Sequence, residues 1–155
     1  MKPFVLKVVK DENNRFPESG RIRNGADAAA YLDACVFDKE ALWREQAWML
    51  TVDRNGNANG VFMLSLGSTE STDFDKKLVV KAALDTMCWG VIIAHNHPSG
   101  DVRPSTVDID KTRQLKRVLD VFDIKLLDHV ILGEKKYFSF SDEVEGNIPR
   151  FMKTC

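Results

Sequence analysis

The chain has 155 residues, of which 44% are hydrophobic and 29% charged, so it is long enough to form one domain with a substantial core. Its net charge of −1 gives no support for strong sequence-independent binding to nucleic acid, which depends on a basic surface, although a local basic patch is compatible with it. Three cysteines without a C-x-x-C pair, no signal-peptide pattern and no apolar run near the ~20 residues that span a bilayer indicate a reduced cytoplasmic protein without a membrane segment.

The hydrophobic periodicity predicts a chain of alternating helices and strands. In chain order, we expect a strand at Phe4–Val9, helices at Ala26–Val36 and Lys39–Trp43, strands at Gln46–Val52 and Gly60–Leu66, a helix at Asp73–Met87, a strand at Trp89–Ala94, a helix at Ser105–Phe122, and strands at Ile124–Leu132 and Tyr137–Phe140. Residues 67–72 are expected to form a loop, and the mostly polar residues 141–155 a surface tail. This order predicts an α/β fold with a mixed sheet covered by helices.

Two histidines stand at the end of a short apolar run in the middle of the chain. Val91–Ala94 is typical of a buried strand, and side chains two residues apart in a strand point to the same side, so His95 and His97 present two imidazoles in one direction. The helix predicted from Ser105 places Asp108 in its first turn, where it can point back at the histidines. Two imidazoles and a carboxylate suit a catalytic zinc site, whose fourth position is left to water.

The same residues also have a purely structural interpretation. A single histidine at a strand end is most often structural or solvated, and Ser105 followed by an acid three residues later is the pattern of a helix capping box. The two interpretations conflict only in part, because a carboxylate that binds a metal still suits the helix N-terminus electrostatically. The spacing alone leaves both open.

A more specific signal comes from the residues around the histidines. The order H-x-H, seven residues, S, two residues, D is similar to the motif of the JAMM (MPN/JAB-type) zinc metalloproteases. The fuller pattern resembles the RadC-like branch of that superfamily, over roughly residues 40–140 of what we expect to be a single domain of residues 1–155. The pattern consists of His95-Asn96-His97-Pro98, Ser99-Gly100, Pro104-Ser105, Asp108 and Leu127-Asp128-His129-Val130-Ile131.

The resemblance implies a fold, a metal and catalytic residues. The fold is a mixed sheet sandwiched between helices, of the kind also seen in cytidine deaminases. One zinc ion per chain is bound by His95, His97 and Asp108. Glu45 is implied as the base that takes a proton from the zinc-bound water and passes it to the leaving amine, and Ser105 as a donor to the developing oxyanion.

Three other residues enter through the same resemblance. Glu40 and Glu70 are weaker candidates for the general base than the glutamate at the start of the predicted strand at Gln46. By itself, His129 is most simply a hydrogen-bonded interior histidine. With the resemblance, it is a group that could orient a zinc ligand without being one.

The leading hypothesis is a zinc metallopeptidase or isopeptidase that hydrolyses an amide bond of a protein or peptide substrate. The alternative is a RadC-like protein associated with DNA repair or recombination, for example on a mobile element, without peptidase activity. Against direct DNA binding, the chain has no room for the N-terminal helix-hairpin-helix segment of longer relatives, and its net charge is near zero. A non-catalytic interaction module is disfavoured by the complete ligand set, and zinc deaminase chemistry by the missing P-C-x-x-C pair. Phosphodiester cleavage and the oligomeric state are left open.

Overall fold

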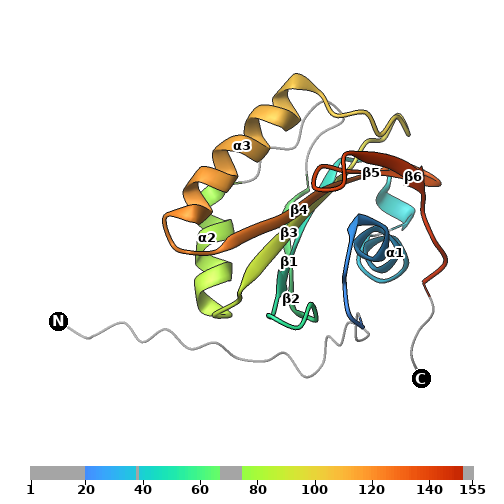
Figure 1. Cartoon of the computed structure of the whole chain (residues 1–155). Coiled ribbons are helices and arrows are strands. Elements are labelled where there is room, and N and C mark those ends of the chain that lie inside the picture. The colour runs from blue at the N-terminus through green and yellow to red at the C-terminus, as the bar shows by residue number, and fades with distance from the viewer. Residues whose placement is uncertain (1–19, 38, 67–74, 152–155) are drawn as a thin grey trace.

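A mixed β-sheet with helices on both faces makes up the part of the chain that the structure, a computed structural model, describes (Figure 1). The described residues are 20–37, 39–66 and 75–151. Their helices are α1 (Gly25–Cys35), the short 3-10 helix η1 (Lys39–Ala41), α2 (Lys76–Asp85) and α3 (Thr106–Asp120). Their strands are β1 (Gln46–Val52), β2 (Ala58–Leu66), β3 (Gly90–Asn96), β4 (Lys125–Leu132), β5 (Lys136–Ser139) and β6 (Val144–Asn147).

Strand β3 is the centre of the architecture. The six strands follow the order β2-β1-β3-β4-β5-β6, with β3 and β4 parallel and every other neighbouring pair antiparallel. All seven residues of β3 are buried, as expected for a strand with partners on both edges and helices on both faces. The carboxyl end of β3 therefore emerges from the most protected part of the sheet.

The two faces of the sheet carry separate hydrophobic cores. Helix α1 covers one face, and α2 and α3 cover the other (Figure 1). On β3, Ile92 and Ala94 belong to the α1 core, whereas Val91 and Ile93 belong to the α2–α3 core. Because side chains alternate between the faces of a strand, His95 lies on the α2–α3 face and Asn96 on the α1 face.

The expected α/β class with a mixed sheet between helices is confirmed. Helix α2 is shorter than the predicted Asp73–Met87, because Thr86 caps it and Met87 has a φ of 48°, outside the helical region. The expected tail contains strand β6, which pairs with β5. The predicted strand Phe4–Val9 and the loop at 67–72 lie outside the described residues. In the described part of the chain, no helix is both long enough and apolar enough to cross a membrane.

Candidate metal centre

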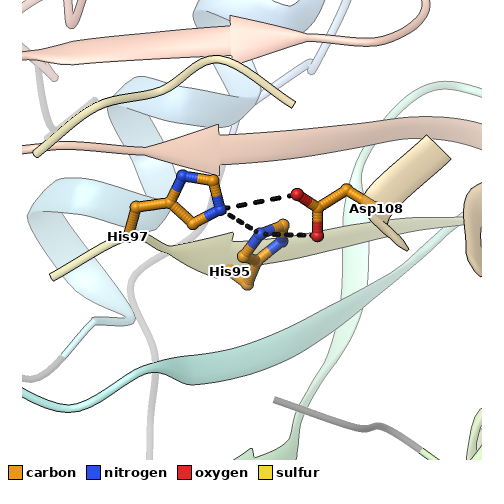
Figure 2. Close-up of side chains that lie close together, drawn as sticks. All are labelled: His95, His97 and Asp108. Carbon is orange, nitrogen blue, oxygen red and sulfur yellow. Dashed lines mark hydrogen bonds and ion pairs between the residues drawn. The ribbon is translucent and has the colours of Figure 1, made fainter. Parts of the chain in front are cut away.

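Three potential metal ligands meet where β3 ends and α3 begins (Figure 2). The Nε2 atoms of His95 and His97 are 3.0 Å apart. Asp108 Oδ1 lies 3.4 Å from His95 Nε2, and Asp108 Oδ2 lies 3.6 Å from His97 Nε2. The predicted proximity of the three side chains is therefore present in the structure, with His95 and Asp108 buried and His97 partly exposed.

These separations fit a tetrahedral zinc ion. Ligand atoms about 2.0–2.1 Å from zinc, at tetrahedral angles, lie about 3.3 Å from one another. The three distances, 3.0, 3.4 and 3.6 Å, bracket that value. The donor set of two imidazoles and one carboxylate also matches the ligands that zinc prefers, and it leaves one coordination position for water or substrate.

The hydrogen bond on the far side of His97 directs its Nε2 lone pair into the cluster. His97 Nδ1 lies 2.5 Å from the backbone oxygen of Asp101, which can only accept, so Nδ1 carries a proton. In the neutral ring, Nε2 then has a lone pair that faces Asp108 and His95. A positive charge between this nitrogen lone pair and the carboxylate, either a proton or a metal ion, is electrostatically favoured.

Asp108 combines the two roles that the sequence left open. Its Oδ2 accepts hydrogen bonds from the backbone N–H and the hydroxyl of Ser105, at 2.8 and 2.6 Å. The Ser105 hydroxyl in turn accepts from the Asp108 backbone N–H at 3.1 Å, which completes a capping box. A carboxylate has two oxygens, so Oδ2 caps helix α3 while Oδ1 remains directed at His95.

Burial and the neighbouring charges set the protonation of the cluster. Burial lowers the pKa of His95 well below its ordinary value, and His129 adds to this effect. The Asp108 carboxylate, 3.6 Å from His97 Nε2, raises the pKa of His97. Burial alone would raise the pKa of Asp108, but the neighbouring His97 and the hydrogen bonds from Ser105 outweigh it and hold that pKa below its usual range. The cluster thus keeps a carboxylate and a neutral His95, the forms that bind metal.

Glu45, the predicted general base, lies beside this cluster. In the antiparallel pairing of β1 with β3, Ala47 is opposite His95 at the end of the register, so Glu45, two residues before Ala47, lies near the end of β3 that leads to His97. Glu45 is half-buried, and after the larger contributions of Asp108 its carboxylate also raises the pKa of His97. Of the weaker candidates, Glu40 is exposed in η1, and Glu70 lies outside the described residues.

The Asn96 side chain forms hydrogen bonds with the backbone on both sides of Glu45. The sequence analysis did not predict this role. Its side-chain nitrogen donates to the backbone oxygens of Leu42 and Arg44 at 3.1 and 3.0 Å. Its side-chain oxygen accepts from the backbone N–H of Gln46 at 2.7 Å. Glu45 stands between two of these bonded residues, so the residue between the two histidines holds its backbone. The asparagine of the H-N-H pattern was the only signal for this in the sequence.

A cavity of about 380 Å³ lies away from the metal centre. Val52, at the end of β1, and Trp89, just before β3, line it. The metal centre is at the other end of both strands, where Glu45 and His95 lie. The donor atoms, and not the size of a cavity, therefore distinguish the candidate site.

Residues 22–146 match the RadC-like JAB domain family, and the chain belongs to this family. Among its relatives, a UPF0758 protein of Flavobacterium johnsoniae is 38% identical over 123 residues, which are 79% of this chain and 52% of the relative. A UPF0758 protein of Thermotoga maritima is 32% identical over 146 residues, which are 94% of this chain and 66% of the relative. A UPF0758 protein of Carboxydothermus hydrogenoformans is 38% identical over 120 residues, covering 77% and 52%. The chain thus spans about half to two thirds of the length of these relatives.

Proposed function

We propose that the chain is a zinc-dependent hydrolase that cleaves an amide bond in a protein or peptide, as a metallopeptidase or isopeptidase. The observation that carries the proposal is the convergence of two imidazole nitrogens and one carboxylate within 3.0–3.6 Å, with Glu45 beside them. Bound zinc would lower the pKa of a water ligand to about 7 and polarise the carbonyl group of the substrate. His95, His97 and Asp108 would hold the ion.

Glu45 is the residue that moves the proton. Glu45 is half-buried and its charge acts on His97, the partly exposed ligand, so we expect water and substrate to enter on this side of the cluster. From there it takes a proton from the attacking water and returns it to the amine nitrogen that leaves. Such general acid–base transfer is typically worth about 10²–10⁴-fold in rate.

Ser105 is proposed to stabilise the negative charge that develops on the substrate oxygen. Its hydroxyl donates to Asp108 Oδ2 at 2.6 Å, so this role requires the hydroxyl proton to turn from Asp108 to the substrate. The backbone N–H of Ser105 also donates to Oδ2 and would keep Asp108 in place during that rotation.

Metal content and cleavage together test the proposal. We expect about one zinc per wild-type chain by elemental analysis, and none in Asp108→Ala. The zinc-loaded protein is incubated with a peptide library, and new termini are identified by mass spectrometry. Glu45→Gln is expected to keep its zinc while its cleavage rate falls by about 10²–10⁴-fold.

The outcomes separate the parts of the proposal. Cleavage retained in Glu45→Gln contradicts the role of Glu45 alone. A zinc-loaded protein that cleaves no peptide contradicts the peptidase assignment and shifts attention to the alternative role in DNA repair or recombination. Binding to single-stranded and duplex DNA over a range of salt concentrations tests that alternative. If the protein does not bind DNA even at low salt, direct contact with DNA is excluded.

A further inference from the structure

His129 lies behind the metal centre, on the side of His95 away from the ligand cluster. It projects from β4 toward the α2–α3 face and is 2% exposed. Its Nε2 is 2.8 Å from His95 Nδ1, and its Nδ1 is 2.6 Å from Thr112 Oγ1. The ring stacks on Phe140, with centroids 4.8 Å apart and planes within 8°. Both nitrogens are thus occupied by neighbours other than the metal, and the ring has one fixed orientation.

One backbone carbonyl sets the direction of the hydrogen bonds that connect Thr112, His129 and His95. Thr112 Oγ1 lies 2.6 Å from the backbone oxygen of Asp108, which can only accept, so the hydroxyl proton points to that oxygen. Thr112 Oγ1 then accepts from His129 Nδ1–H. The neutral His129 ring therefore has its lone pair on Nε2, which accepts from His95 Nδ1–H. His95 is left with a lone pair on Nε2, the atom that faces His97 and Asp108.

We infer that Thr112 and His129 are positioning residues that hold His95 in the Nδ1–H tautomer and present its Nε2 lone pair to the metal. The inference rests on the proposed metal centre. The opposite tautomer of His95 would direct an N–H into the ligand cluster and set two lone pairs face to face at 2.8 Å, outside the cluster. The Nε2 lone pairs of His95 and His97, 3.0 Å apart, instead face the position of the metal ion, or of a proton in the metal-free protein.

The chain of hydrogen bonds also links two ligands that come from different elements. It begins at the backbone of Asp108, on α3, and ends at His95, on β3, after passing through β4. The separation of Asp108 from His95 is thereby held by side chains as well as by the packing of α3 on the sheet. Groups that orient metal ligands in this way commonly contribute about 10–100-fold to metal affinity.

Two substitutions of Thr112 in the full chain test the inference. Thr112→Val keeps the shape of the side chain and removes the hydroxyl, whereas Thr112→Ser keeps the hydroxyl. We expect Thr112→Val to weaken zinc binding about 10–100-fold, measured by competition with a chromophoric chelator, and Thr112→Ser to bind zinc within about threefold of wild type. His129→Phe, which keeps a ring to stack on Phe140, should weaken binding at least as much as Thr112→Val.

The tautomer is read separately in the metal-free protein, from the ring ¹⁵N shifts of His95 in long-range ¹H–¹⁵N spectra. Wild type and Thr112→Ser should show Nδ1–H, and Thr112→Val and His129→Phe a mixture of tautomers. An Nε2–H tautomer in wild type overturns the inference, as do unchanged spectra and zinc affinity in Thr112→Val. Because these spectra need no metal, they decide the inference even if the wild type binds no zinc, a result that would defeat the proposed function instead.

Discussion

At the scale of single residues, one carboxylate serves the helix and the candidate metal site together. Asp108 Oδ2 receives two hydrogen bonds from Ser105, and its Oδ1 faces His95 at 3.4 Å. The capping interactions fix the carboxylate before any metal arrives, which lowers the entropy that binding would otherwise cost. The local pattern of a capping box and that of a metal ligand are therefore compatible at this position.

Ser105 is expected to contribute to stability independently of the metal. Replacing it by alanine removes the hydroxyl that accepts from Asp108 N–H and donates to Oδ2. We expect Ser105→Ala to lower the free energy of unfolding of the metal-free protein by about 1 kcal/mol, measured by urea denaturation. Ser105→Thr, which retains the hydroxyl, is the matched control and should lose less. Equal stability of the two variants would contradict the capping role.

The candidate metal ligands could be predicted from the sequence, but the residues that support them could not. His95, His97 and Asp108 carry a local spacing signal, because the strand end and the helix start follow each other closely in the chain. Thr112 and His129 meet only because β4 lies parallel to β3 under α3. This contact is formed by the tertiary structure and has no local sequence pattern. Only the family resemblance therefore indicated a role for His129.

At the scale of elements, the pairing of β1 with β3 assembles the candidate site. The antiparallel register sets the beginning of β1 beside the end of β3, and Asn96 joins the two with three hydrogen bonds. The expected position of Glu45 at the start of a strand agrees with this register. The site thus depends on the pairing and hydrogen bonding of two strands that are far apart in the sequence.

Asn96→Asp tests this hydrogen bonding. The carboxylate can still accept from Gln46 N–H, but it places a negative charge against the carbonyl oxygens of Leu42 and Arg44 instead of a donor. We expect the free energy of unfolding to fall by about 2–4 kcal/mol in urea denaturation, with faster hydrogen exchange of the backbone at residues 42–46. The exposed Asn147→Asp is the charge-matched control and should change stability by less than about 0.5 kcal/mol. Comparable losses in both variants would show that Asn96 does not act through these bonds.

The elements differ in how well the sequence predicts them. The buried strands β1 and β3 have uninterrupted apolar runs and agree with the predictions closely. Strand β6 is short and mostly exposed, and it contains Gly146, so it lacks an alternating pattern. Its conformation comes from backbone hydrogen bonding to β5, which is a property of the partner strand and not of its own side chains.

At the scale of the whole molecule, binding of zinc should stabilise the fold. The ligands come from β3 and α3, so the complete site exists only in the folded chain. At a free zinc concentration of 100 times the dissociation constant, we expect a gain of about 2.7 kcal/mol in unfolding free energy. For a domain of this size, that is a rise of roughly 5–11 °C in Tm.

Thermal unfolding with zinc and then with a chelator measures this gain. Asp108→Ala, compared with its own metal-free form, should show a rise of less than about 1 °C, because one of three ligands is missing. An equal rise in wild type and variant would place the stabilising zinc elsewhere, for example on cysteine thiols. The fold class could be predicted from the order of helices and strands. Helices that cover both faces of a sheet require central strands that are apolar on both faces, and the sequence of these strands shows this.

The close spacing of the three ligand atoms also limits which ions can occupy the site. Calcium prefers six or more oxygen ligands at 2.3–2.6 Å, which two nitrogens and one carboxylate 3.0–3.6 Å apart do not offer. The ligand set does not exclude nickel or copper. Imidazole and carboxylate ligands generally bind copper more tightly than zinc, and they bind nickel somewhat more weakly than copper. Exclusion of these competitors therefore has to come from the supply of ions in the cell. The selectivity of this site is a property shared between the protein and its surroundings.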